Sequence, residues 1–183
     1  MRALTLIQPW AWAIAHAGKR VENREWQPPD SLFGQRVAIH AGKKFDDRAL
    51  VWIREETSAQ VPTKEEFVHG AIECVATLRG CIALKNFCGR GNGLLTQQEI
   101  CEAIDSPWFG GPVGWVLADV VALSCPVPCR GAQGLWTLPD DVETEVMRQL
   151  VCTQGCHNID DPDSDYRGCS CEGACPCHDE VRT

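Results

Sequence analysis

The 183-residue sequence contains no run of about 18 apolar residues, so no segment of it is expected to cross a membrane as a helix. It also lacks an internal repeat and a basic stripe. Residues 1–100 carry 13 Lys or Arg against 11 Asp or Glu, and residues 101–183 carry 4 against 14, which gives the net charge of −8. Proteins that neutralise many phosphates of a duplex need such a stripe. The sequence therefore favours recognition of one nucleotide or a short single strand over general duplex binding.

The N-terminal residues match part of the pattern of a signal peptide. Arg2 precedes a mostly apolar stretch that ends in Ala15-His16-Ala17, which is similar to a signal-peptide cleavage site. However, Gln8-Pro9 interrupts the apolar stretch, and only one basic residue precedes it. We therefore expect a cytoplasmic protein, with secretion as the alternative.

Residues 8–26 concentrate charged and aromatic side chains around one short turn. Pro9 is suited to the first position of a helix, and Gly18 is suited to the position just after its end. Residues 19–26 then alternate as in a strand, with Lys19 on one face. The opposite face would carry Arg20, Glu22, Arg24 and Trp26. Two guanidiniums, a carboxylate and an indole are unusual on a core face, so this segment is a candidate binding surface.

The same segment resembles the signature of the ASCH family, a relative of the PUA-like fold. In that signature a Q-P-W helix is followed by a glycine and then by K-x-V-E-x-R-x-W. The matching residues are Gln8, Pro9, Trp10, Gly18, Lys19, Arg20, Val21, Glu22, Arg24 and Trp26. The match is closest to the ASCH domain of the transcriptional coactivator called activating signal cointegrator, and bacterial stand-alone ASCH proteins are also similar. The resemblance covers roughly residues 1–140 and implies that this segment lines a cavity.

The rest of the pattern alternates short strands with short helices. Strands are expected near residues 4–7, 36–40, 71–78 and 113–123, and helices over 46–57, from Thr96 to about Ile104, and from Asp140 or Asp141 to about Leu150. The nearly all-apolar residues 113–123 are typical of a central strand buried on both faces. For residues 1–150 the pattern and the resemblance together predict an α+β fold, a PUA-like small mixed β-barrel with short flanking helices. A cysteine-rich C-terminal tail follows over residues 151–183.

We expect the motif and the strand that carries His40 to form one ligand-binding cleft. The candidate residues are Gln8, Trp10, Lys19, Glu22, Arg24, Trp26, His40 and Lys43, with Trp136 as a further aromatic wall. A base stacked on an indole gains about 1–3 kcal/mol, while a carboxylate or amide can recognise the base edge. From the pattern alone, a structural ion pair over an ordinary core is the stronger interpretation, and His40 by itself is typical of a packing histidine. The resemblance reverses that order and favours binding of RNA or a modified nucleotide.

Nucleoside amidohydrolase activity on acylated cytidine is the alternative function that the resemblance implies. Some small ASCH proteins use a lysine and a threonine of this turn with a glutamate, which makes Lys19 and Glu22 the catalytic candidates here. Val21 and Asn23 stand where a threonine would be needed to supply the activated hydroxyl. Glu22 can still act as a base for water, but its cationic neighbours weaken it in that role. A binding function is therefore preferred to an enzymatic one.

Residues 151–183 contain a second candidate site that is rich in thiols and imidazoles. The candidate metal ligands are Cys152, Cys156, His157, Cys169, Cys171, Cys175, Cys177 and His178. They are enough for two tetrahedral zinc ions, although the C-x-C and C-x3-C spacings differ from those of standard zinc fingers. The segment is acidic and almost free of large apolar residues, so hydrophobic burial alone cannot fold it.

Three interpretations of this tail stay open: zinc binding, disulfides, and a disordered acidic tail with free thiols. Zinc is favoured over disulfides in an intracellular protein. A zinc-stabilised tail would also allow a third function, as a module that contacts a protein partner.

The cysteines outside the tail have simpler roles. Cys74, Cys81, Cys88 and Cys101 are expected in the core, and Cys125 and Cys129 are distant candidates for the metal site.

Overall fold

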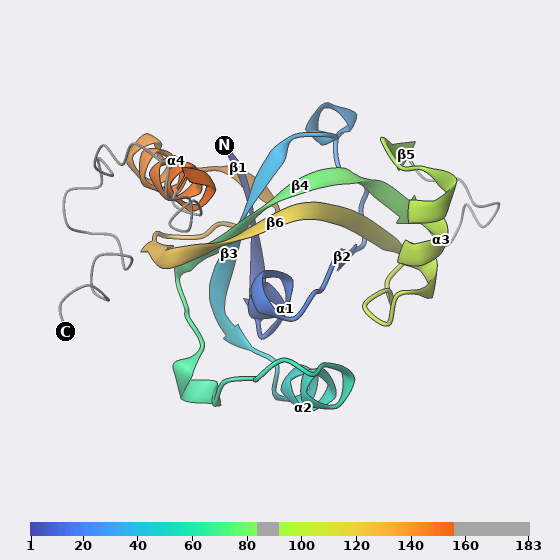
Figure 1. Cartoon of the computed structure of the whole chain (residues 1–183), viewed down its shortest axis with the longest axis horizontal. Helices are drawn as coiled ribbons and strands as arrows, with labels where there is room; N and C mark the ends of the chain where they lie inside the picture. Colours follow the sequence, from blue (N-terminus) through green and yellow to red (C-terminus); the bar gives the residue numbers. More distant parts are fainter. Residues whose placement is uncertain (84–91, 156–183) are drawn as a thin grey trace, which may run out of the picture.

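Seven strands form one mixed sheet in the computed structural model, which describes residues 1–83 and 92–155 (Figure 1). The strands are β1 (Arg2–Gln8), β2 (Val21–Arg24), β3 (Arg36–Phe45), β4 (Ala71–Ala83), β5 (Asn92–Gly93), β6 (Val113–Pro128) and β7 (Leu135–Thr137). Their order across the sheet is β2-β6-β4-β3-β1-β7, and the short β5 pairs with β4. β1 and β3 are parallel, and the other described pairs are antiparallel.

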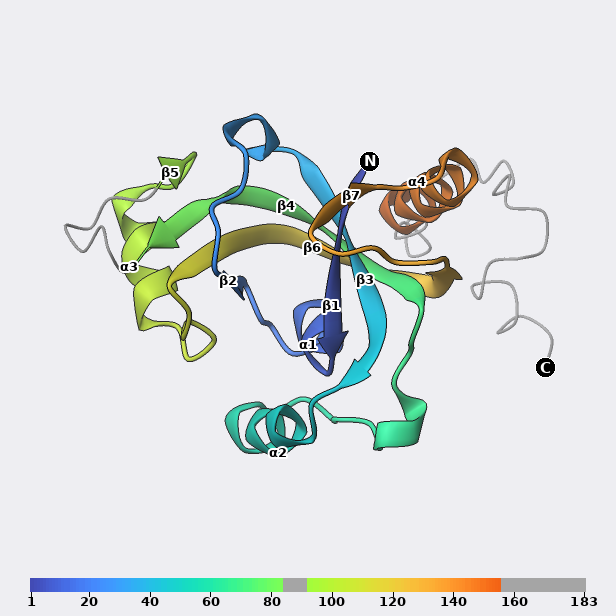
Figure 2. The same ribbon diagram turned by 180° about the vertical axis from the view of Figure 1, so that it is seen from behind.

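The sheet curves strongly, but it does not close into the predicted barrel (Figure 2). Its edge strands, β2 and β7, have four and three residues and do not pair with each other within the described residues. Strands this short offer few backbone groups with which to complete a ladder, which is a physical reason for the open edge. The prediction of an α+β fold with short helices is confirmed, and the prediction of a closed barrel is wrong.

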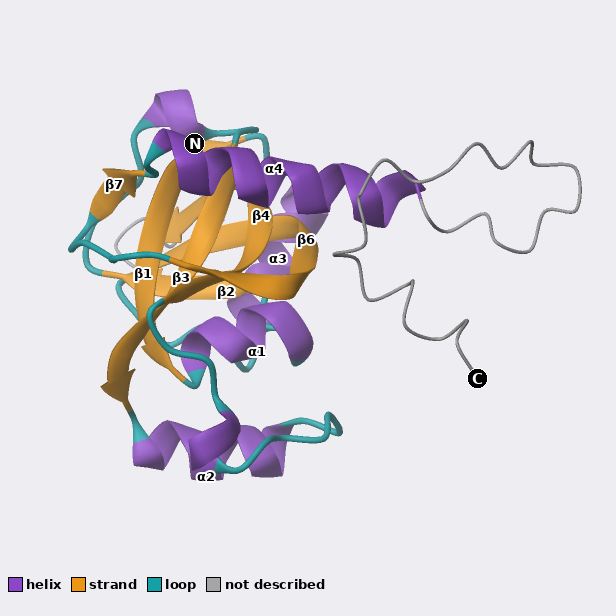
Figure 3. Cartoon of the chain, turned by 90° about the vertical axis from the view of Figure 1, so that its left-hand side faces the viewer, coloured by secondary structure: helices purple, strands orange, loops and turns teal. Residues whose placement is uncertain are grey.

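Helices cover both faces of this sheet. In the described part of the chain they are α1 (Trp10–His16), α2 (Asp47–Glu56), α3 (Gln97–Asp105) and α4 (Asp140–Gly155), with 3-10 turns η1 (Asp30–Leu32) and η2 (Lys64–Glu66). Ile14 of α1 packs with Ile39 and the fully buried Trp115 on one face. Val146 of α4 packs with Ala38 on the opposite face. Figure 3 shows α4 on one side of the sheet and α1 and α2 on the other.

Short-range signals in the sequence set most helix boundaries. Asp46 caps α2 with its side chain, and Thr96 forms a capping box with Glu99 at the start of α3, where the sequence predicted a helix to begin. Gly18 has φ +72° just after α1, a conformation that glycine adopts without a steric penalty. Pro9 is the cap of α1 and not its first residue, a shift of one position from the prediction. None of the helices in these described residues is long and apolar enough to span a membrane.

β6 is longer and less uniformly buried than the sequence predicted. Residues 113–117 are buried, but residues 118–122 are all at least partly exposed. β2 pairs with β6 only over Val113–Val116. The remainder of β6 is therefore an edge of the sheet on that side, and its residues are more exposed to solvent. An edge strand tolerates proline, which explains why β6 continues to Pro128, beyond the expected end near residue 123.

Candidate nucleic-acid interface

A buried ion pair lies at the centre of the motif. Lys19 Nζ is 2.5 Å from Glu22 Oε2 and donates to the backbone oxygen of Val21 at 2.6 Å. The side chains of Lys19 and Glu22 are only 2% and 8% exposed. Arg24 Nη1 approaches the other oxygen of Glu22, Oε1, at 3.6 Å. Both carboxylate oxygens therefore face cations of the protein itself, and the pair can stay charged although it is out of water.

The position of Lys19 differs from the prediction made from strand alternation. β2 begins only at Val21, so Lys19 precedes the strand and does not follow its alternation. The backbone N–H of Lys19 donates to the oxygen of Ala13 in α1, which ties this residue to the helix end. The prediction that Lys19 and Glu22 face opposite sides is therefore wrong. Arg20, which was expected beside Glu22, instead donates to the backbone oxygen of Ile14 at 2.9 Å.

Arg24 and Trp26 form the rim of the motif. Trp26 is 37% exposed, and its ring meets the buried ring of Trp115 edge-on at a centroid distance of 4.7 Å. Trp115 Nε1 also donates to the backbone oxygen of Trp26 at 3.1 Å. The Arg24 guanidinium lies 5.7 Å from the Trp26 ring centroid, within cation–π range. The indole of Trp26 is thus fixed from within the protein while part of it remains in contact with water.

A hollow of about 430 Å³ opens beside this rim. Its lining residues are Asn23, Arg24, Glu25, Trp26 and Pro112. Asn23 also fixes residues 108–111, because its Oδ1 accepts the N–H groups of Gly110 and Gly111 and its Nδ2 donates to the backbone oxygen of Trp108 at 2.8 Å. In the sequence, Asn23 stood out only because it lacks a hydroxyl. Its hydrogen bond to Trp108 could not be predicted, because the two residues are 85 positions apart.

A second group of tryptophans lies near the ion pair. Lys19 Nζ is 5.9 Å from the ring centroid of Trp10. The Trp10 ring is 5.9 Å from Trp52 in α2, and Trp52 is 5.0 Å from Trp108. All three tryptophans are partly exposed. The fold therefore brings Trp52 and Trp108 to Trp10 from distant parts of the sequence, whereas the described ring contact of Trp26 is with Trp115.

The predicted ligand residue Gln8 belongs to a different, fully buried polar cluster. Its Nε2 donates to Glu73 Oε2 at 3.0 Å and to the backbone oxygen of Val68 at 2.8 Å, and its Oε1 accepts the N–H of Trp12. Glu73 is 3% exposed, and burial raises the pKa of its carboxyl to about 7, with the Gln8 hydrogen bond opposing the rise. His16 Nε2 lies 3.8 Å from Glu73 Oε1, and burial lowers the pKa of this imidazole.

Glu73 is a residue that the sequence analysis missed. It is the one carboxylate in the otherwise apolar stretch Ala71-Ile72-Glu73-Cys74-Val75, which is a usable signal. The register of β4 shifts at this point against both β3 and β6, so Glu73 occupies a bulge. Bulges re-aim single side chains, and here the carboxylate meets Gln8 and His16 at the two ends of α1.

His40 and Trp136 lie on the face of the sheet away from the ion pair. His40 pairs with Thr5, whereas its neighbour Ile39 packs in the core beneath α1. His40 Nε2 lies 3.2 Å from the backbone oxygen of Cys129, and burial lowers the pKa of the imidazole, which that hydrogen bond partly opposes. Its Nδ1 is buried without a partner among the described residues. The prediction that His40 shares a face with the motif is wrong, because side chains alternate along β3.

No described contact joins the remaining predicted site residues to the surface around Arg24 and Trp26. Lys43 is exposed in the second half of β3. Cys152 lies within α4, and the other seven predicted zinc ligands fall outside the described residues, so zinc binding by the tail stays a prediction. Within residues 1–83 and 92–155, no three His, Cys, Asp or Glu side chains are grouped to hold a metal, so Cys125 and Cys129 form no such site there.

The other cysteines are divided between core and surface. Cys74 and Cys81 are buried as predicted, and Cys88 lies outside the described residues. Cys101 is exposed, contrary to the prediction. It occupies the outward side of α3, whose buried side chains are Ile100 and Ala103.

Comparison with known proteins gives structural matches alone, since no protein-family model and no curated protein matches the chain. The ASCH protein of Zymomonas mobilis is 18% identical, with a TM-score of 0.43, over 82% of this chain and 93% of that one. A single-residue mutant of that protein is 15% identical, with a TM-score of 0.45, over 80% of this chain and 95% of that one. These structures carry the family name that the motif at residues 8–26 predicts, and similarity at this level assigns neither a ligand nor a role to any residue.

Proposed function

We propose that the surface around Arg24 and Trp26 binds RNA or another single-stranded nucleic acid. The observation that carries this proposal is the Trp26 indole, which is 37% exposed, braced by Trp115 and flanked by the Arg24 guanidinium beside a hollow. A fixed indole is a platform on which any base can stack, and a neighbouring guanidinium can meet a phosphate. The motif's resemblance to the ASCH family supports the same function.

Each residue of the motif has a distinct part in this proposal. Trp26 stacks on a base, and Arg24 contacts a phosphate or the base edge. Lys19 and Glu22 are too deeply buried to touch the ligand, and they hold β2 in place from within. Asn23 fixes residues 108–111 through its hydrogen bonds to them. The ligand therefore meets a surface that is already shaped, which lowers the entropic cost of binding.

The direct test is the fluorescence anisotropy of a labelled single-stranded RNA octamer titrated at a fixed, low salt concentration. Trp26→Ala removes the stacking platform, worth about 1–3 kcal/mol, and should weaken binding by roughly 5- to 150-fold. Trp26→Phe keeps an aromatic face and should retain most of the affinity. Arg148→Ala, on α4, removes an arginine far from the motif and serves as the control. Equal affinity of the wild-type protein and Trp26→Ala would contradict the proposal.

Amidohydrolase activity on acylated cytidine is the alternative function, because the fold brings the two catalytic candidates Lys19 and Glu22 into contact, although their burial weighs against it. The absence of a hydroxyl at Val21 and Asn23 weighs against it, because no side chain of this turn supplies the nucleophile. The test is release of the free acid from acylated cytidine by the purified protein. If the wild-type protein turns over this substrate and Glu22→Gln abolishes turnover while its circular dichroism spectrum is unchanged, then the protein is an enzyme and not only a binding domain.

A further inference from the structure

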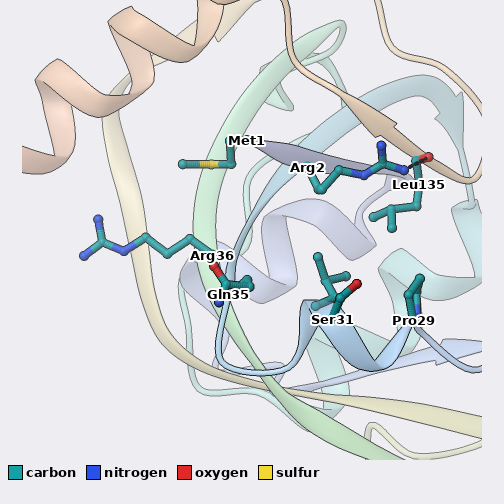
Figure 4. Close-up of a pocket in the computed structure, with 8 residues that line it drawn as sticks. Met1, Arg2, Pro29, Ser31, Gln35, Arg36 and Leu135 are labelled. Atoms are coloured by element: carbon teal, nitrogen blue, oxygen red, sulfur yellow. Dashed lines mark hydrogen bonds between the residues drawn. The ribbon is translucent and has the colours of Figure 1, made fainter.

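We infer that a strand bound at Trp26 continues into a second hollow beside Arg2 and Arg36, so that the site takes several consecutive nucleotides and not a free mononucleotide. This inference rests on the proposed function and specifies its ligand. The second hollow has a volume of about 550 Å³. Its lining comes from three stretches of the chain, at residues 1–2, 29–36 and 135, and includes Arg2, Ser31, Gln35 and Arg36 (Figure 4).

Arg2 is held in a fixed position at the wall of this hollow. Its Nη1 donates to Thr137 Oγ1 at 2.8 Å, and its Nη2 donates to the backbone oxygen of Leu135 at 2.7 Å. These bonds use two of the five N–H donors of a guanidinium. The remaining donors are available to an anion, and the contacts with β7 have already restricted the side chain. Figure 4 shows Arg2 and Leu135 together on one side of the hollow, opposite Ser31 and Pro29.

Arg36 supplies a second guanidinium at the margin of the same hollow. It is exposed at the start of β3, and Figure 4 shows its side chain extended outwards past Gln35. A long flexible side chain in this position can turn towards a phosphate that enters the hollow. The Ser31 hydroxyl and the Gln35 amide add groups that hydrogen-bond to phosphate oxygens and to a ribose 2′-hydroxyl. The lining contains no aromatic ring, so it suits a sugar–phosphate backbone better than a base.

The two hollows are joined by a short piece of chain. Trp26 lines the first and Pro29 lines the second, and three residue steps span at most about 11 Å. A stacked strand advances about 3.4 Å per nucleotide, so this distance corresponds to about three nucleotides. Figure 2 shows β2, the segment that follows it, β1 and β7 on the side facing the viewer. Both hollows also lie along the open side of the sheet, at the edge strands β2 and β7.

The charge of these hollows is opposite to that of the chain as a whole. Together their lining contains three arginines (Arg2, Arg24 and Arg36) and one carboxylate, Glu25. The whole chain has a net charge of −8. A polyanion is therefore attracted to the track from Trp26 to Arg36, although the chain as a whole is acidic. A mononucleotide at Trp26 would leave the second hollow and two of the three arginines unused.

The experiment compares labelled oligouridylates of two, four and eight nucleotides by fluorescence anisotropy, with the full-length protein. We expect affinity to rise at least fivefold from the dinucleotide to the octamer. Arg36→Ala should weaken octamer binding about fivefold, reduce the salt slope by about 0.7 for one lost phosphate contact, and leave dinucleotide binding unchanged. Arg48→Ala, an exposed arginine of α2, is the matched control and should change neither ligand.

The outcomes separate this inference from the proposed function. Equal affinities for dinucleotide and octamer, together with weaker binding by Trp26→Ala, would contradict a role for the second hollow and leave the proposed binding function intact. If no oligonucleotide binds, the proposed function fails and the inference fails with it. If hexaglutamate displaces the octamer as efficiently as unlabelled octamer does, the arginines serve an acidic peptide, and the inference is overturned.

Discussion

Lys19 and Glu73 are both buried ionisable side chains beside α1, yet their surroundings compensate the charge in different ways. Lys19 has a carboxylate of Glu22 at 2.5 Å, so the two charges balance each other. Glu73 has an amide of Gln8 at 3.0 Å and an imidazole of His16 at 3.8 Å, and its pKa is raised by burial to about 7. A buried carboxylate needs either a cation or a proton. Glu73 is therefore expected to exchange a proton near neutral pH, whereas Lys19 and Glu22 are in direct contact with each other.

The two clusters also support different parts of the molecule. The Lys19–Glu22 pair underlies β2, whose end carries Arg24 and the rim of the first hollow. The Glu73 cluster joins β4 to the two ends of α1 through Gln8 and His16. Disrupting the first should affect ligand binding together with stability, and disrupting the second should affect stability alone. The following predictions test this difference, beginning with the largest effect.

Removing the lysine of the ion pair should have the largest effect. Lys19→Met leaves the Glu22 carboxylate buried with only Arg24 at 3.6 Å as partial compensation, and it should lower the free energy of unfolding by about 3 kcal/mol. Urea unfolding monitored by circular dichroism measures this change. The double variant Lys19→Met with Glu22→Leu removes both charges and should recover most of the loss. A single variant that costs less than about 1 kcal/mol would show that the pair does not depend on mutual compensation.

Neutralising Glu73 should change the pH dependence of stability. The folded pKa of about 7 lies above the ordinary value of 4.5, so the wild-type protein loses stability as pH rises from about 4.5 to 7. Glu73→Gln cannot lose a proton and keeps an oxygen that accepts from Gln8. It should therefore nearly equal the wild type at pH 4.5 and exceed it by about 3 kcal/mol at pH 8.

Thermal or urea unfolding across this pH range measures the effect of Glu73→Gln. The control is Glu55→Gln, which changes an exposed carboxylate of α2 and should not alter the slope of stability against pH. Parallel curves for the wild type and Glu73→Gln would contradict the assignment of a buried, protonated Glu73.

Asn23→Ala should have an intermediate effect on stability and a local effect on dynamics. The variant loses three hydrogen bonds that fix residues 108–111, which should cost about 1–2 kcal/mol. The amide protons of Gly110 and Gly111 should exchange faster with solvent, as measured by NMR. Asn23→Asp keeps the acceptor for both N–H groups and should preserve their protection. Unchanged exchange in Asn23→Ala would mean that other contacts hold this loop.

Arg24→Ala should have the smallest effect on stability and a clear effect on binding. The separation of 3.6 Å between Arg24 and Glu22 exceeds a good hydrogen bond, so its loss should cost about 0.5 kcal/mol. Affinity for the RNA octamer should fall roughly fivefold, as expected for one lost contact of about 1 kcal/mol. If stability falls by as much as in Lys19→Met, then Arg24 is part of the structural cluster and not of the rim.

The sequence revealed those features that depend on neighbouring residues. Helix starts at Asp46 and Thr96 follow from side chains that bond backbone N–H groups within three residues, so local pattern is sufficient to place them. The glycine after α1 is likewise predictable from its conformational freedom. In contrast, the alternation of side chains along a strand wrongly predicted the direction of Lys19. The strand begins two residues later, and the backbone N–H of Lys19 bonds to Ala13 of the preceding helix.

The sequence alone determined the motif of residues 8–26, the capped helices, and the uneven charge, which is slightly positive over residues 1–100 and negative over residues 101–183. Only the tertiary structure decided that Gln8, Lys19 and Glu22 are buried, that His40 faces away, and that Glu73 joins Gln8. It also placed Arg2 and Arg36 beside a hollow close to Trp26. The reason is physical: propensities and caps act over a few residues, whereas burial and pairing depend on strands that meet from distant parts of the chain.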